Sequence, residues 1–282
     1  MTVLAAVAAP FGRDLDAAFA RIEALVADAR ARGVQLLALP EATFGGYLAT
    51  LGDSGVAEQL PEHSLPPPLD VDGPEVARLA RIAGDMVVTA GFCEADGGLR
   101  YNSAVAVTGD GVLGVHRKVH QPLGEANGYA AGDGFAALET PAGRIGMLIC
   151  YDKAFPEAAR TLAVDGAEVL VCMSAWPGSR TGAAADLAED RWTRRFDLFD
   201  QARALENQIV WVSANQSGTF GALRFVCSAK VVGPGGDVLA TTGVAPGVAV
   251  ADVDVAQVLA DARRSMGHLR DRRPETYGVR VA

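Results

Sequence analysis

Short apolar runs that lead into a polar residue recur along this chain. Gly146 to Ile149 is one such run, and because it is too short for a helix and follows Gly143 it is typical of a buried strand. Phe155 to Arg160 carries a proline near its first turn and a glutamate after it, which predicts the start of a helix. Cys150 lies between the two. Backbone N–H groups and a helix dipole would favour its thiolate there, although an inert core cysteine is an equal alternative.

The same periodicities extend over the rest of the sequence. Alternating or continuous apolar residues predict strands at residues 3–9, 34–39, 86–93, 101–108, 112–116, 168–173, 208–214, 225–232, 237–241 and 248–253. Helical spacing predicts helices at residues 14–32, 74–83, 183–207 and from about 254. Residues 43–73 and 118–134 have no strong period, and long connections of this kind often border a site. The alternation predicts an α/β fold with a mixed sheet and helical layers.

Composition narrows the class of protein. The chain has 282 residues, half of them apolar, which is enough for a large core, and we expect a single domain over residues 1–282. It contains no uninterrupted run of about 18 apolar residues, so no membrane span is expected. Pro10 and Arg13 interrupt the apolar N-terminus where a signal peptide would continue. The net charge of -9 is spread along the chain without a basic stripe, which argues against a nucleic-acid partner.

The cysteines and histidines give no sign of a disulfide framework or a metal site. The four cysteines, at positions 93, 150, 172 and 227, show no CxxC spacing, and we therefore expect a reducing, cytoplasmic location. His116 and His120 flank Arg117-Lys118, but no carboxylate or third histidine lies nearby at ligand spacing. No metal is expected there.

Three of the predicted strands end in a residue that can take part in chemistry. Glu41, Lys118 and Cys150 follow LLALP, VLGVHR and GMLI. Ligands of open α/β sheets bind beyond the carboxyl ends of the strands, so the three side chains would converge if these strands are neighbours. A carboxylate can activate a thiol, and an ammonium can stabilise an oxyanion. Taken singly, the glutamate is more often a cap or a solvated loop residue, and the lysine a surface residue.

These stretches resemble the nitrilase, or carbon–nitrogen hydrolase, superfamily over nearly the whole chain. The signatures read LLALPEATFGGY, HRKVHQPLGE and LICYDKAFPEAAR, with weaker support from residues 132–135, 202–218 and 272–278. The resemblance implies a four-layer α-β-β-α sandwich and puts the family's catalytic Glu-Lys-Cys on Glu41, Lys118 and Cys150. It also implies that a second glutamate, which orients the substrate and the lysine, falls on Glu125. The family's aromatic pair after this glutamate is Gly128-Tyr129 here, so the pocket wall is expected to differ.

The resemblance implies a mechanism without a metal or an organic cofactor. Glu41 would remove the thiol proton, and Cys150 would attack a carbonyl or nitrile carbon. Lys118 and the backbone N–H of Tyr151 would hold the oxyanion, and water would hydrolyse the resulting thioester. A homodimer or larger assembly, paired through the helical faces, is the family habit.

The residues around Cys150 bear on the substrate. Tyr151-Asp152, where true nitrilases usually carry Trp-Glu, is similar to the amidase and carbamoylase branches, and residues 174–177 with 202–208 are similar to omega-amidases, which cleave terminal amides of small dicarboxylic monoamides. Phe196, Phe199 and the loop at 178–190 depart from that branch. We expect a hydrolase that cleaves the C–N bond of a small amide or an N-carbamoyl compound. A true nitrilase and a catalytically silent binding or regulatory protein are the alternatives. Trp176, Tyr47 and Tyr129 are expected to line the pocket.

Overall fold

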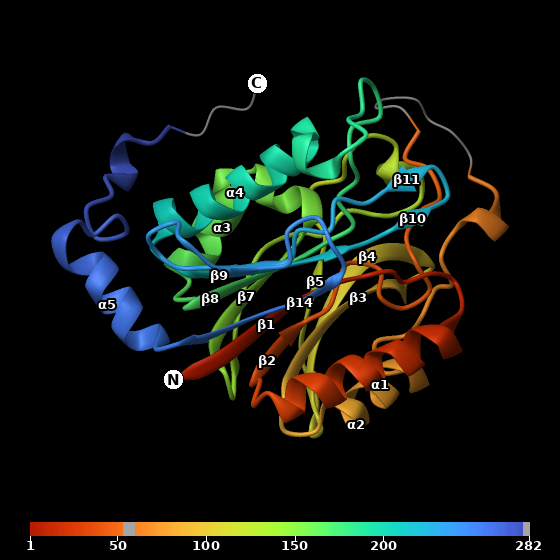
Figure 1. Ribbon diagram of the computed structural model, residues 1–282, viewed down its shortest axis with the longest axis horizontal. Coiled ribbons are helices and arrows are strands. Elements are labelled where there is room, and N and C mark those ends of the chain that lie inside the picture. Colours follow the sequence, from red (N-terminus) through yellow and green to blue (C-terminus); the bar gives the residue numbers. More distant parts are fainter. Residues whose placement is uncertain (53–59, 279–282) are drawn as a thin grey trace.

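The computed structural model describes residues 1–52 and 60–278 (Figure 1). Part of the predicted connection at 43–73, residues 53–59, lies outside the described residues. The α-helices within the described residues are α1 (Leu15–Ala31), α2 (Pro74–Ala83), α3 (Pro156–Val164), α4 (Arg191–Asn207) and α5 (Val255–Ser265). The strands there are β1 (Thr2–Ala9), β2 (Leu36–Ala38), β3 (Val87–Asp96), β4 (Leu99–Thr108), β5 (Gly111–Arg117), β6 (Ala137–Thr140), β7 (Gly143–Ile149), β8 (Val169–Ser174), β9 (Val210–Gln216), β10 (Thr219–Phe220), β11 (Leu223–Arg224), β12 (Lys230–Val232), β13 (Val238–Thr241) and β14 (Gly247–Val253).

Most strands belong to one large mixed sheet that is bent into two facing halves. Its order is β5-β4-β3-β2-β1-β9-β8-β7-β6, with β14 beside β1 and the β12–β13 hairpin beside β9. The two halves meet where β1 pairs with β9, and this pairing involves only Ala8 with Asn215 and Ala9 with Gln216. The strands from β3 to β7 along this order are mutually parallel. Their carboxyl ends therefore lie at one end of the molecule.

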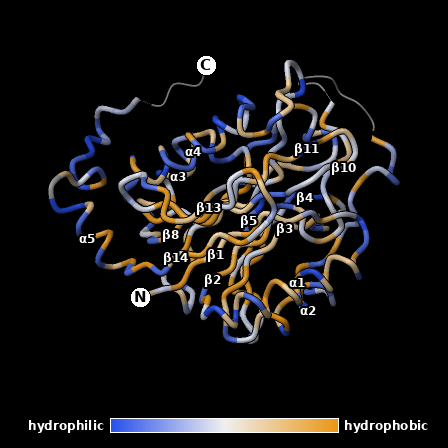
Figure 2. The backbone as a smooth tube through the Cα atoms, in the orientation of Figure 1, coloured by the Kyte–Doolittle hydropathy of each residue, from blue (hydrophilic) through white to orange (hydrophobic). Residues whose placement is uncertain are grey.

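Alternation along the strands creates one core between the two sheet halves and one core under each helical layer. The central core contains residues from both halves: Leu4, Ala6, Leu36, Ala38, Ile145, Met147, Val171 and Val212. The intervening residues of β1 and β2, such as Val7 and Leu37, pack under α1 and α2, whereas Leu148, Leu170 and Trp211 pack under α3 and α4. Figure 2 shows the strands as hydrophobic, with the polar residues gathered on the helices and loops. The predicted four-layer α-β-β-α sandwich is confirmed.

Two predicted elements differ most in their boundaries from those that the periodicity indicated. Residues 183–190, predicted as helix, precede α4, because the Asp190 carboxylate caps α4 at Trp192 and also accepts hydrogen bonds from Ser179. The strand predicted at 225–232 is reduced to β12, because Cys227 and Ser228 have φ angles of 62° and 56°, outside the extended region. No helix in the described part of the chain is long and apolar enough to cross a membrane.

Candidate active site

Glu41 follows β2, and hydrogen bonds from β3 and β9 fix its backbone. Gly91 of β3 donates its N–H to the carbonyl of Pro40 at 3.1 Å, and the Gln216 side chain of β9 donates to the Glu41 carbonyl at 2.9 Å. The approach to β3 is so close that a Cβ on Gly91 would lie 2.7 Å from the Glu41 Cα atom. A glycine is therefore required at this point, and the position of Glu41 is determined by the sheet.

The Glu41 carboxylate lies at the centre of a buried hydrogen-bond network. Its Oε1 atom accepts from Lys118 Nζ at 2.8 Å and from Asn102 Nδ2 at 2.6 Å, and its Oε2 atom accepts from the backbone N–H of Ala175 at 2.5 Å. These three donors leave about one further acceptor site, on Oε2, of the roughly four that a carboxylate offers. The carboxylate is thus held in one orientation and can still accept one proton.

Glu125 completes this network from the opposite side of Lys118. Its two carboxylate oxygens accept from Lys118 Nζ at 3.0 and 2.7 Å, and Asn102 Nδ2 donates to it at 2.7 Å. Both carboxylates and the lysine are fully buried. Burial alone would lower the pKa of Lys118, but the charges of Glu125 and Glu41 outweigh it and raise that pKa. Lys118 therefore stays an ammonium although no solvent reaches it.

Asn102 is the member of this network that sequence reasoning missed. It lies near the beginning of β4, within a run interpreted only as a strand. A signal was present, because Asn102 and Ser103 are two consecutive polar residues in a strand that is otherwise largely apolar and buried. Buried polar side chains in native proteins have partners, and the partners of Asn102 are the two glutamates.

Cys150 lies at the end of β7, on the other half of the sheet. Its φ of 48° is in the left-handed region, which is strained for a residue with a Cβ atom and makes a sharp turn between β7 and the following 3-10 segment, Cys150–Ala154. A strained turn of this kind presents a nucleophile at the top of a sheet in other α/β enzymes. The side chain borders the pocket described below.

The expectation of a thiolate at Cys150 is wrong for the resting protein. Burial raises the pKa of Cys150 well above its ordinary value, and the negative charge of Glu41 raises it further, while Lys118 lowers it only in part. The thiol is therefore neutral at physiological pH, and it becomes a nucleophile only when a base takes its proton. Glu41 and Lys118 act on this pKa, so both lie within electrostatic range of the sulfur.

The three strands that end at Glu41, Lys118 and Cys150 are not neighbours in the sheet, so the condition under which the sequence predicted their convergence is not met. β3 and β4 separate β2 from β5, and β7 belongs to the other half. The side chains converge because the two halves face each other and their carboxyl ends lie at the same end of the molecule. The convergence is a property of the folded sandwich and is not encoded in any one stretch of the chain.

Asp152 ties the turn at Cys150 to the segment that follows Lys118. Its carboxylate accepts hydrogen bonds from the backbone N–H of Ile149 at 3.1 Å and of His120 at 2.9 Å, and it lies 3.2 Å from His116 Nε2 and 2.9 Å from His120 Nδ1. Burial would raise the pKa of Asp152, but the contacts with the two histidines outweigh this and lower the pKa to about 2. His116 and His120 therefore act as partners of the Asp152 carboxylate.

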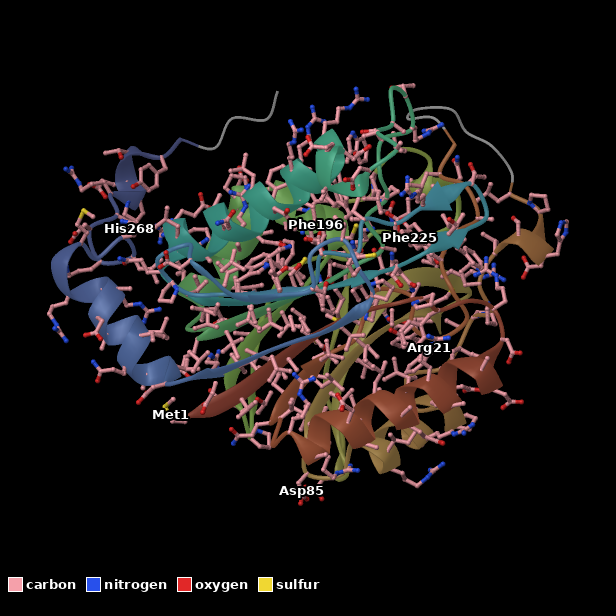
Figure 3. The ribbon with its side chains drawn as sticks, viewed as in Figure 1. Met1, Arg21, Asp85, Phe196, Phe225 and His268 are labelled. Atoms are coloured by element: carbon pink, nitrogen blue, oxygen red, sulfur yellow. The ribbon has the colours of Figure 1, made fainter. Side chains whose placement is uncertain are left out.

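A second buried ion cluster supports the other side of the same turn. Lys153 Nζ donates to Asp200 Oδ1 of α4 at 2.7 Å, and Lys230 Nζ of β12 donates to Asp200 Oδ2 at 2.9 Å. Lys153 Nζ also lies 3.0 Å from the ring centroid of Phe196, which is buried between α4 and the sheet (Figure 3). The residues after Cys150 are thus anchored to α4 and to β12.

A pocket of about 410 Å³ opens beside Cys150. Its walls are mostly apolar and are formed by Tyr47, Leu51, Pro122, Leu123, Cys150, Tyr151, Ala154, Ala175, Trp176, Pro177, Trp192, Arg195 and Phe199. Tyr47 and Trp176 line it, as the sequence predicted, and so does Tyr151, whose backbone N–H the resemblance assigns to the oxyanion. Tyr129 does not belong to this lining, because its ring is buried in the cluster that contains Leu48 and Phe225. The volume is that of a site for a small molecule.

The family model for carbon-nitrogen hydrolases matches residues 3–263 of the chain. The chain belongs to the carbon-nitrogen hydrolase family. This carbon-nitrogen hydrolase is 31% identical over 269 residues to a nitrilase of Pyrococcus abyssi, and the alignment covers 93% of each chain. It is 29% identical over 269 residues to an omega-amidase of Xenopus tropicalis, covering 90% of this chain and 89% of that one.

Solved structures of the family share the fold of this carbon-nitrogen hydrolase. One is a mutant of the amidase from Nesterenkonia sp. AN1, with covalent addition of the acetamide moiety of fluoroacetamide at the active site cysteine. It is 27% identical, covers 97% of this chain and 94% of its own, and superposes with a TM-score of 0.76. The relatives are thus a nitrilase, an omega-amidase and an amidase that has an active site cysteine.

Proposed function

We propose that this chain hydrolyses the carbon–nitrogen bond of a small amide through a thioester on Cys150. The observation that carries the proposal is the buried network of Glu41, Lys118 and Glu125 within electrostatic range of a cysteine at the wall of a small-molecule pocket. Membership of the carbon-nitrogen hydrolase family supports it. The Lys153–Asp200–Lys230 cluster shows that buried charges can be structural, but the Glu41–Lys118–Glu125 network lies beside a cysteine and a pocket, which favours a catalytic role.

In the first step, Cys150 attacks the amide carbon while Glu41 takes the thiol proton. The raised pKa of the thiol supports a transfer coupled to the attack, and the vacant acceptor site on Glu41 Oε2 can receive the proton. The carbonyl oxygen becomes an oxyanion, for which the Lys118 ammonium and the backbone N–H of Tyr151 are the proposed donors. Glu41 then gives its proton to the nitrogen, the C–N bond breaks, and ammonia or an amine leaves.

In the second step, water hydrolyses the thioester. Glu41 takes a proton from the water, the hydroxide oxygen adds to the acyl carbon, and the same donors hold the second oxyanion. The C–S bond then breaks, the acid leaves, and Cys150 recovers its proton from Glu41. Glu125 keeps Lys118 charged and in place during both steps, without itself taking part in proton transfer.

Ammonia release from matched amides and nitriles tests this proposal and its nearest alternative. We expect the purified protein to hydrolyse butanamide faster than butanenitrile, and Cys150→Ala to abolish turnover of both. A higher kcat/KM for the nitrile would instead identify a nitrilase. This second candidate function is favoured by the similarity to the nitrilase of Pyrococcus abyssi. If neither compound nor a wider amide panel is hydrolysed, the proposed function is wrong.

The setting of the enzyme and its assembly are further proposals. All four cysteines are free and buried, which supports a reducing, cytoplasmic environment.

Leu198 and Leu205 of α4 and Val164 of α3 are between 48% and 67% exposed, which supports a homodimer formed through these helices. Analytical ultracentrifugation tests the assembly: a dimer that Leu198→Glu weakens is expected, and a monomer at all concentrations would exclude it.

A further inference from the structure

The pocket beside Cys150 contains one formal charge that no neighbour neutralises. Among the described residues that line it, Arg195 is the sole residue with a charged side chain. Its guanidinium makes no hydrogen bond or ion pair with any residue in the described ranges, 1–52 and 60–278. A guanidinium offers five N–H donors in a planar fork that matches a carboxylate. Arg195 is exposed at the edge of the pocket, so water solvates these donors in the free protein, and a ligand in the pocket can replace that water.

The geometry of α4 directs Arg195 toward the pocket. Trp192, Arg195 and Phe199 are three and four residues apart, which puts them on one face of the helix, and all three line the pocket. The neighbouring arginines of the same helix are used elsewhere. Arg194 pairs with Glu189 at 2.7 Å, and Arg191 donates to the carbonyl of Thr181 at 2.7 Å. Arg195 is thus distinguished from its neighbours by position and by its lack of a partner.

The buried cations near the site are already committed to carboxylates. Lys118 is held by Glu41 and Glu125, and Lys153 by Asp200. A negatively charged group on a substrate would find no free cation at either lysine. Apolar side chains, among them Leu123 and Trp176, form most of the wall and suit a short hydrocarbon chain.

We propose that Arg195 binds a carboxylate on the substrate, so that the enzyme selects amides that carry a negative charge away from the scissile bond. This inference rests on the proposed amidase function and deepens it. The carboxylate can belong to the acyl side, as in the monoamide of a short dicarboxylic acid, or to the amine side, as in an N-carbamoyl amino acid. In both, a guanidinium and carboxylate paired at this exposed position gain about a factor of 2 to 10 in affinity over a neutral end.

Calorimetric binding to Cys150→Ala, which cannot turn substrate over, tests the recognition separately from the chemistry. The ligands are succinamate, N-carbamoyl-β-alanine and the neutral butanamide. We expect at least one anionic ligand to bind about 2- to 10-fold more tightly than butanamide. Adding Arg195→Gln should bring this ratio close to one, whereas the control Arg194→Gln, which removes an adjacent positive charge outside the pocket, should keep it. The anionic ligand that binds more tightly identifies the side that carries the carboxylate.

A ratio near one in the protein with Arg195 intact would overturn the proposal, and so would a high ratio that survives Arg195→Gln. Turnover by the protein with Cys150 intact separates this inference from the proposed function. If butanamide and succinamate are hydrolysed with equal kcat/KM and bind equally, the amidase function stands and the carboxylate site fails. If succinamate binds through Arg195 and no amide is hydrolysed, the site stands and the amidase function fails.

Discussion

Replacing Asn102 with leucine tests whether the buried network sets the protonation of the site. Asn102 donates to Glu41 at 2.6 Å and to Glu125 at 2.7 Å, and it is 2% exposed, so water cannot replace the lost donor without rearrangement. Leucine has a similar size and no polar atom. A hydrogen bond to a charged group contributes about 1.5–3 kcal/mol, and a pKa shift of one unit corresponds to about 1.4 kcal/mol.

The direction of the effect follows from Glu125. Burial raises the pKa of Glu125, while Lys118 and the hydrogen bond from Asn102 lower it. Without that hydrogen bond the pKa of Glu125 rises further, because the ionised form loses one of the two groups that stabilise it. Glu125 must be ionised to hold Lys118. The Asn102→Leu variant would therefore become active only at a higher pH than the native protein. We therefore expect the acidic limb of kcat/KM to move up by about one pH unit in Asn102→Leu.

The assay is the pH dependence of amide hydrolysis, with the fold checked by circular dichroism at each pH. Ser103→Ala is a matched control, because Ser103 is the next residue of β4 and donates to Glu94 at 2.5 Å on the other face of the strand. Ser103→Ala should lower the stability of the protein without shifting the acidic limb of the pH profile of kcat/KM. An acidic limb that stays in place in a folded Asn102→Leu protein, or that moves equally in both variants, would refute the reasoning.

Two further substitutions test the supports of the site. The pKa of Asp152 falls from 3.8 to about 2, so its ionised form adds about 2 kcal/mol of stability, which is complete above pH 4 and is lost as the pH falls toward 2. Asp152→Asn should remove about this amount in urea unfolding at pH 7 and less at pH 3; an equal loss at both would contradict the linkage. Gly91→Ala would put a Cβ 2.7 Å from the Glu41 Cα atom, and should lower kcat roughly 100-fold in a folded protein. Gly134→Ala, where nothing lies within 4 Å of the added Cβ, should keep full activity, and equal activities of the two variants would exclude the clash.

The sequence predicted the elements of the sandwich well, because its strands and helices bury regular faces. The hairpin of β4 and β5 around Gly109–Gly111 and the strand at β7 follow directly from apolar periodicity and turn residues. Periodicity failed where a single side chain decides the local structure. Asp190 ends the loop before α4 by capping the helix, and helical spacing in residues 183–190 carries no information about that cap.

The sequence predicted those residues of the candidate site that follow the ends of strands. The other residues of the site could not be predicted, because long-range packing brings them there. Glu41 and Cys150 come from opposite halves of the sheet, so only the folded sandwich brings them together. Asn102 is hidden inside a strand. The spacing of Trp192, Arg195 and Phe199 puts them on one helix face, but whether that face borders the pocket depends on how α4 packs in the fold. The pKa of Cys150 depends on burial and on Glu41, and neither can be read from the local sequence.

Mass spectrometry of the intact protein during turnover tests the central claim most directly. With butanamide or succinamate as the substrate, rapid acid quenching should trap a protein heavier by the acyl group, and peptide mapping should locate that group on Cys150. The adduct should disappear in Cys150→Ala and be formed much more slowly in Glu41→Gln. Hydrolysis of amide without any adduct in the native protein, or an adduct on Cys93, Cys172 or Cys227, would contradict the account.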